Sequence, residues 1–189
     1  MNRGRISVSK LIFMALCCDI GMITKKIISP GANIITEMLH IPGGIATGFS
    51  IMFILIAAYM CKINGSATVM CIVQSILALA MGTTGSMGIF AIVGYVVPGI
   101  VIDICILIFQ NTEINIYEQI MIINALAGIS AAICANLLTF RLWGPPLWLY
   151  LAVALTTGII SALPGAAIIK RLENVCRFDN DRQYEKVKK

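Results

Sequence analysis

Long apolar runs, separated by short breaks of polar, glycine and proline residues, dominate this chain of 189 residues. Each run approaches the ~20 residues that an α-helix needs to cross the hydrocarbon core of a bilayer. The breaks contain turn residues, for example Ser29-Pro30-Gly31 and Gly144-Pro145-Pro146. The pattern therefore predicts six membrane-spanning helices, at residues about 11–28, 42–61, 66–82, 87–109, 119–140 and 147–169.

Composition points to the same class of protein. Hydrophobic residues make up 59% of the chain and charged residues 12%, with a mean hydropathy of +0.92. Soluble domains carry about 25% charged residues, so a soluble enzyme, a nucleic-acid binder or a secreted disulfide scaffold fits poorly. The expected fold class is an all-α integral membrane protein, a six-transmembrane-helix bundle over residues 1–170. A basic cytoplasmic tail, frayed or disordered, is expected over residues 171–189.

The distribution of basic residues predicts the orientation. With the N-terminus in the cytoplasm, eleven Lys and Arg residues fall in the inner segments and three in the outer ones. This positive-inside bias places both termini in the cytoplasm of a multi-pass protein of the bacterial plasma membrane. The first apolar stretch is interrupted by Asp19 and lacks a small-x-small cleavage pattern. It is therefore read as a retained helix and not as a signal peptide.

Rows of small residues mark two helices. Ala154, Gly158, Ala162 and Ala166 follow one face of the sixth span, and Ala127, Ala131 and Ala135, flanked by Gly128 and Ala132, follow the fifth. Small residues let helix backbones approach closely in lipid. These rows predict tight helix contacts, internal to the bundle in the favoured reading and against a partner subunit in the other.

Polar side chains within the spans need a partner or a function, because a charge at mid-bilayer costs roughly 2.5–3.5 kcal/mol on insertion scales. Asp19 falls near the middle of the first span and Asp103 in the inner half of the fourth. An interhelical hydrogen bond is the favoured reading for Asp103 and for Asn124 of the fifth span.

The outer half gathers the polar and aromatic groups of a candidate small-molecule pocket. For Trp148 an aromatic belt at the membrane surface is an equal alternative, and for His40 an exposed loop position. The loop at 82–87, bracketed by Gly82, Gly85 and Gly88, is expected to act with the connection 30–41 as an outer lid. The candidate binding residues are Glu37, His40, Gln74, Tyr95, Asn136, Arg141 and Trp148.

Motifs for chemistry are missing from the sequence. The seven cysteines form no C-x-x-C pair and His40 is the single histidine, so neither a metal site nor a cofactor is expected. The sequence contains no P-loop and no hydrolase motif. We therefore expect a protein that is not an enzyme and does not itself hydrolyse ATP.

One stretch supports a family resemblance. It contains Ile56-Ala57-Ala58-Tyr59-Met60, then Lys62, Gly65 and Ala67, and continues to Gly85-Ser86-Met87. It resembles the substrate-binding S components of energy-coupling factor (ECF) transporters, and most closely the YkoE-type S component associated with thiamine and hydroxymethylpyrimidine. Acidic side chains of that family's pocket are replaced here, at or near Gly44, Cys71 and Ala78. Leu39-His40-Ile41-Pro42 is similar to the Met-His-Ile opening of cobalt and nickel S components, although it is internal here.

The resemblance implies a subunit that captures a vitamin or cofactor precursor, with a thiamine-related compound as the first expectation. An ECF transmembrane coupling subunit and two cytoplasmic ATPases would supply the energy. Three alternatives stay open at this point: an ion-coupled secondary transporter that titrates Asp19 and Asp103, a metal-specific S component, and a membrane enzyme or assembly factor.

Overall fold

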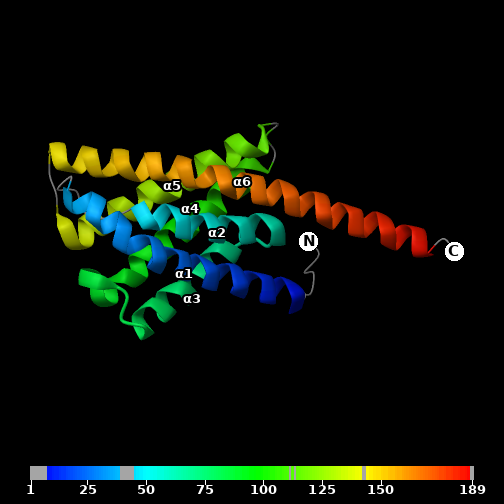
Figure 1. Cartoon of the computed structure of the whole chain (residues 1–189), viewed down its shortest axis with the longest axis horizontal. Helices are drawn as coiled ribbons and strands as arrows, with labels where there is room; N and C mark the ends of the chain where they lie inside the picture. Colours follow the sequence, from blue (N-terminus) through cyan, green and yellow to red (C-terminus); the bar gives the residue numbers. More distant parts are fainter. Residues whose placement is uncertain (1–7, 39–44, 111, 113, 142–143, 188–189) are drawn as a thin grey trace.

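The computed structural model describes residues 8–38, 45–110, 112, 114–141 and 144–187. Every element in these residues is helical, and six long helices pack side by side into an elongated bundle (Figure 1). A short 3-10 helix, η1 (Gly85–Phe90), precedes the fourth, and a π-helical turn, η2 (Asn136–Phe140), follows the fifth. The six are α1 (Val8–Met38), α2 (Ile45–Cys61), α3 (Ser66–Ala80), α4 (Ala91–Phe109), α5 (Ile116–Ala135) and α6 (Pro145–Val187).

The helices have the length and surface of a membrane bundle. Three stretches of the described chain, Gly88–Phe109, Ile116–Leu138 and Pro145–Leu172, are long and apolar enough to cross a membrane, and α2 and α3 are shorter apolar helices. Large apolar side chains such as Ile76 and Ile108 project from the bundle surface. Soluble monomers rarely expose contiguous apolar patches beyond a few hundred Å². The chain is therefore a membrane-embedded helical protein.

Two helices are longer than the spans that the sequence predicts. The first span was expected to end at residue 28 and to be followed by a connection at 30–41, but α1 continues through Pro30 to Met38. Proline removes one backbone hydrogen bond, and membrane helices tolerate that loss where neighbouring groups replace it. At the other end of the chain, α6 continues as one helix to Val187. The segment after Lys170 contains no glycine or proline, so nothing in it stops the helix.

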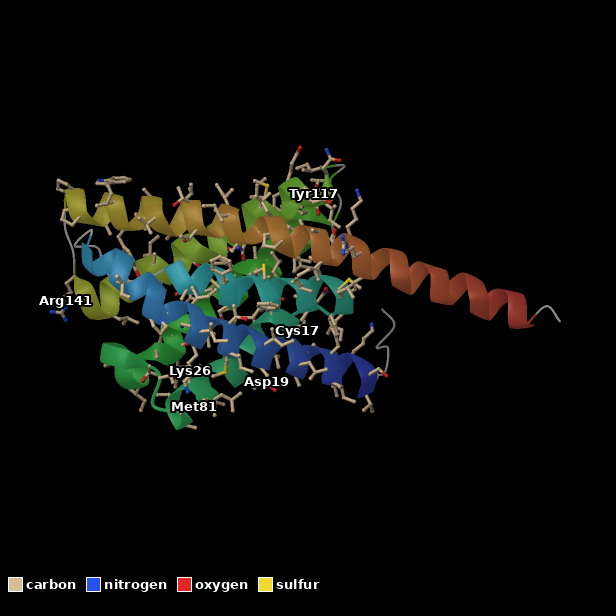
Figure 2. The ribbon with its side chains drawn as sticks, viewed as in Figure 1. Cys17, Asp19, Lys26, Met81, Tyr117 and Arg141 are labelled. Carbon is tan, nitrogen blue, oxygen red and sulfur yellow. The ribbon has the colours of Figure 1, made fainter. Side chains whose placement is uncertain are left out.

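The bundle has two chemically different ends. At one, which we call the Lys10 end, Lys10 Nζ donates to the Cys61 carbonyl at 2.9 Å, and Lys170 Nζ lies 5.3 Å from the centre of the Tyr117 ring. The described parts of α1 and α6 begin and finish toward this end (Figure 1). The opposite end, which we call the Arg141 end, holds the connection after α3 and the turn before α6 (Figures 1 and 2).

Asp103 joins α4 to the beginning of α3. Its carboxylate accepts hydrogen bonds from the Thr68 backbone N–H (2.8 Å), the Thr68 hydroxyl (2.6 Å) and the Ala67 N–H (3.2 Å). The first N–H groups of a helix have no partner within the helix, and a negative charge there is favourable. The prediction of an interhelical hydrogen bond for Asp103 is confirmed, with a helix terminus as its partner.

Small residues of α5 and α6 pack against each other inside the bundle. Asn124 of α5 donates from Nδ2 to the Gly158 carbonyl (2.7 Å) and to the Ser161 hydroxyl (2.9 Å) of α6. A Cβ added at Gly158 would lie 2.9 Å from the Ala125 Cα, and one at Gly128 would lie 3.2 Å from the Ala154 carbonyl oxygen. The predicted hydrogen bond of Asn124 and the internal packing face are both confirmed.

Candidate functional site

A cavity of about 310 Å³ lies within the bundle, in the half nearer the Arg141 end. All six long helices contribute to its wall: the later turns of α1, α3 and α5 meet the early turns of α2, α4 and α6. Glycine and alanine make up much of the lining, for example Gly94, Ala131 and Ala154. The polar lining residues are Lys25, Ser29, Thr47, Ser50, Gln74, Thr83, Thr84, Tyr95 and Thr157.

The hollow arises where the small residues of α5 and α6 continue past their contact. Gly128 and Ala154 touch each other and also line the cavity. One turn farther along α5, Ala132 and Ala135 present methyl groups to the same space. The residues that bring these two helices together therefore leave the neighbouring volume without large side chains. A cavity of this size, with apolar walls and a few polar groups, is typical of a small-molecule site.

Lys25 is the one charged side chain among the described lining residues. Its Nζ donates to the Tyr95 hydroxyl at 2.7 Å and lies 4.5 Å from the centre of the Tyr95 ring. Both contacts are with a neutral group, and within the described residues no carboxylate lies within salt-bridge distance of Lys25. Lys25 is half-buried, and its ammonium gains from the face of the aromatic ring, but a hydrogen-bonded anion would stabilise it more.

Gln74 presents an acceptor without a donor. Its side chain is completely buried, and Nε2 donates to the Cys18 carbonyl at 3.1 Å. Gly21 lies against this amide, since a Cβ at Gly21 would come 3.2 Å from Nε2. Within the described part of the chain, Gln74 Oε1 has no hydrogen-bond partner. A buried polar atom normally has one, so the exception needs an explanation.

Hydroxyl groups surround these two residues. Thr157 donates to the Val153 carbonyl at 2.7 Å, and Thr83 donates to the Ala78 carbonyl at 3.2 Å. Both hydroxyls keep oxygen lone pairs that can accept a hydrogen bond from a ligand. The backbone carbonyl of Gly94 is a further acceptor. Pro98, one turn later in α4, has no N–H group that could donate to it.

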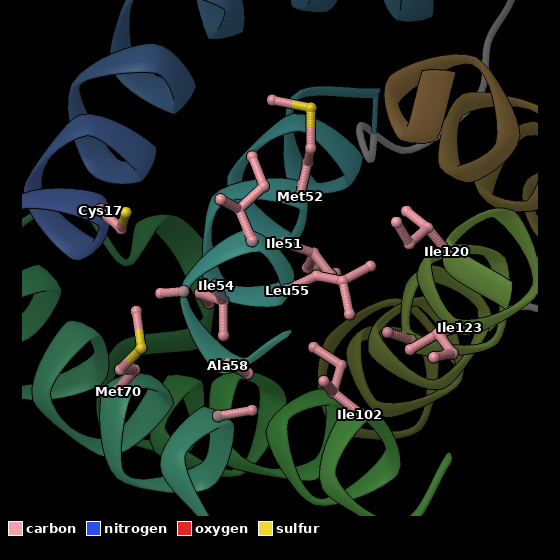
Figure 3. Close-up of a cluster of buried hydrophobic side chains, with 14 of the residues drawn as sticks. Cys17, Ile51, Met52, Ile54, Leu55, Ala58, Met70, Ile102, Ile120 and Ile123 are labelled. Carbon is pink, nitrogen blue, oxygen red and sulfur yellow. The ribbon is translucent and has the colours of Figure 1, made fainter. Parts of the chain in front are cut away.

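Packed apolar side chains close the cavity on the side of the Lys10 end. Ile51 and Ile54 of α2 belong both to the cavity wall and to the main core. Beyond them, Leu55, Ile102 and Ile123 meet between α2, α4 and α5 (Figure 3). At the other side the lining reaches Thr83, which is exposed in the connection between α3 and η1. The cavity is therefore nearest to solvent at the Arg141 end.

The structure brings two of the seven predicted site residues to this cavity, Gln74 and Tyr95. Asn136 is buried at the beginning of η2 but is not among the lining residues. Arg141 projects away from the bundle (Figure 2), and the side chain of Trp148 is 73% exposed. The position of Trp148 fits the alternative reading of a residue at the membrane surface.

The other two predicted site residues, Glu37 and His40, belong to the segment 30–41 that was expected to be an outer connection. The side chain of Glu37 and the whole of His40 lie outside the described residues. Thr83 and Thr84 come from the other part of the expected lid and do line the cavity. Whether this connection moves as a lid stays a prediction.

Sequence reasoning missed Lys25 and the hydroxyl groups of α2. Lys25 was counted with Lys26 among the basic residues outside the membrane, although both fall within one long helix. Thr47 and Ser50 lie in the first turns of α2, where the apolar pattern of the span gave them no weight. A lysine inside a predicted helical span is the signal that identifies the site.

The described residues contain no group of three or more His, Cys, Asp or Glu side chains that could hold a metal ion. The polar groups that converge on the cavity are suited to binding and orienting a small molecule. Comparison of the chain with models of protein families, with curated proteins and with solved structures finds no match.

Proposed function

We propose that this protein is the substrate-capturing membrane subunit of an ECF-type importer for a small organic micronutrient. The observation that carries the proposal is the cavity enclosed by six helices, with polar groups inside it and no catalytic set among its described lining residues. In this proposal the chain crosses the membrane six times and both termini lie in the cytoplasm. The cavity then faces the outside of the cell.

The two halves of the bundle support a division of labour in which this subunit captures the substrate and other subunits supply the energy. The half toward the Arg141 end is hollow, whereas the half toward the Lys10 end is filled by large apolar side chains. A subunit that captures its substrate from one side needs such a closed floor. Passage inward then requires a rearrangement that separate coupling and ATPase subunits drive, because the sequence has no P-loop.

The ion-coupled secondary transporter is less well supported. Its expected titrating groups were Asp19 and Asp103, and neither lines the cavity. Asp103 is occupied at the beginning of α3, and Asp19 lies on the exposed surface of α1 (Figure 2). A carboxylate that couples proton movement to substrate transport has to lie close enough to the substrate for binding to change its protonation.

The proposal is tested by identifying what the purified protein carries. The chain is isolated in mild detergent from cells grown in rich medium and denatured, and the released small molecules are identified by mass spectrometry. We expect one compound at near-stoichiometric amounts. Ala131→Leu, which fills the cavity, is expected to lose it, whereas the matched control Ala152→Leu at an exposed position of α6 is expected to keep it. Size-exclusion chromatography verifies that both variants are folded.

Two results would overturn the proposal. One is the absence of any retained compound in the wild-type protein and in the control variant. The other is accumulation of the identified compound by vesicles that contain this chain alone, driven by a proton or sodium gradient. The second result would establish the ion-coupled carrier instead.

A further inference from the structure

We infer that the ligand of this cavity is a small organic anion, whose acidic group binds Lys25 while a donor group on the same molecule reaches Gln74 Oε1. The inference rests on the proposed function and adds the chemical class of the substrate. It follows from the charge of the lining, from one unsatisfied acceptor, from the position of a helix terminus and from the size of the space.

The charge of the lining is positive and unbalanced. Among the described lining residues Lys25 carries the one charge, and its partner is the neutral Tyr95. Lys25 is half-buried, and an ammonium in such a position is stabilised more by a hydrogen-bonded opposite charge than by a neutral partner. An acidic ligand supplies that missing charge and replaces the hydrogen bond to the Tyr95 hydroxyl with a charge-assisted one. A cation such as thiamine would instead add a like charge beside Lys25.

The backbone of α2 reinforces this preference. The helix begins at Ile45, and Ala46, Thr47 and Gly48 of its first turn line the cavity. The first N–H groups of a helix lack partners within the helix, and the helix dipole places its positive end there. The positive end of α2 and the ammonium of Lys25 thus act on the same space.

Gln74 sets a second requirement. Its Oε1 is buried and has no partner within the described residues, and the Cys18 carbonyl holds Nε2 so that the amide oxygen is fixed. An N–H or O–H group of the ligand would satisfy this acceptor. The matching compound therefore has one acidic group and at least one hydrogen-bond donor at a different position.

The size of the space limits the compound further. The cavity volume of about 310 Å³ lies at the lower end of the range of roughly 300–1,000 Å³ that is usual for small-molecule sites. The space therefore fits a compact acid with one ring or a short chain.

The test uses three probes of nearly equal size that differ in charge: 4-hydroxybenzoate, 4-hydroxybenzamide and 4-hydroxybenzylamine. Each has a hydroxyl donor opposite its variable group. Binding to the detergent-purified full chain is measured by ligand-induced thermal stabilisation over a concentration series. We expect the carboxylate to bind at least about tenfold more tightly than the amide, as for a hydrogen bond to a charged partner. The amine is expected to bind most weakly.

Neighbouring residues of α1 supply the matched variants. Lys25→Gln is expected to abolish the preference for the carboxylate. Lys26→Gln is expected to keep it, because Lys26 is exposed and is not among the lining residues. Lys25→Arg retains the positive charge and is expected to keep most of the preference. If Lys25→Gln does not fold, Lys25→Arg still tests whether a positive charge at this position favours the carboxylate over the amide.

Three outcomes of the probe experiment overturn the inference: the amide or the amine binds wild type as tightly as the carboxylate, Lys25→Gln keeps the preference, or none of the probes binds. These outcomes are separate from a failure of the proposed function. The mass-spectrometry experiment separates the two. A neutral or cationic compound that is released from wild type and absent from Ala131→Leu would contradict the inference of an anionic ligand but would agree with the proposed capture function.

Discussion

The contact between α5 and α6 allows one substitution to be worked through from the structure. Gly158 faces α5, and a Cβ added there would lie 2.9 Å from the Ala125 Cα and 3.1 Å from the Asn124 carbonyl oxygen. Ordinary van der Waals contact begins at 3.4 Å. Both opposing atoms are backbone, so no side chain can rotate away. Gly158→Ala therefore forces the two helices about 0.5 Å apart.

The free-energy change has three parts. Overpacking of a tight core costs about 1–3 kcal/mol. Separation of the helices also weakens the hydrogen bond from Asn124 to the Gly158 carbonyl, worth about 0.6 kcal/mol in a membrane protein. The gain in helix propensity from glycine to alanine returns about 0.5–1 kcal/mol. We expect Gly158→Ala to lower the free energy of unfolding by about 2 kcal/mol.

The assay is reversible unfolding in mixed micelles by titration with sodium dodecyl sulfate, monitored by circular dichroism. Gly31→Ala is the matched control, because Gly31 lies within α1 with no other heavy atom within 4 Å of the added Cβ. It is expected to be neutral or stabilising by up to about 1 kcal/mol. If Gly158→Ala proves as stable as Gly31→Ala, the close contact between α5 and α6 does not exist as described.

Three further predictions concern other parts of the bundle. Asp103→Asn is expected to destabilise the protein by about 1–3 kcal/mol in the same assay, because a charged acceptor at the beginning of α3 is lost; Asp19→Asn, at an exposed position of α1 with no hydrogen-bond partner among the described residues, breaks no such contact and removes a charge from the membrane-facing surface, so it is expected not to destabilise the protein. Gln74→Met is expected to change stability little, since it removes one hydrogen bond and one unsatisfied acceptor together, but to weaken binding of 4-hydroxybenzoate about tenfold by thermal shift; unchanged binding would remove Gln74 from the site. Cysteines introduced at Asn64 and Met81, which are exposed and lie just before and just after α3, are expected to react with an impermeant maleimide from opposite sides of the membrane; labelling of both from one side would contradict the proposed topology.

Apolar periodicity and small-residue spacing were sufficient to predict the class of fold and one of its tightest contacts. A helix that contacts lipid needs apolar side chains along its whole length. The apolar pattern is therefore continuous and can be recognised from the sequence alone. The row from Ala154 to Ala166 was equally legible, because close helix approach in lipid requires small residues at regular spacing. Polar residues such as Asn124 and Asp103 were correctly assigned to interhelical hydrogen bonds, since membrane helices offer them few other partners.

The tertiary structure decided where the cavity lies and which side chains enter it. A proline normally ends a helix, and only contacts with neighbouring helices determine that α1 passes through Pro30 and carries Ala32 to the cavity. Lys25 and Lys26 are adjacent in the chain, yet a rotation of about 100° per residue turns one toward the cavity and the other outward. Sequence by itself determined that this chain is a membrane-embedded helical bundle with tight small-residue contacts. The rotation of each helix about its own axis was decided by packing, because it depends on residues distant in the chain.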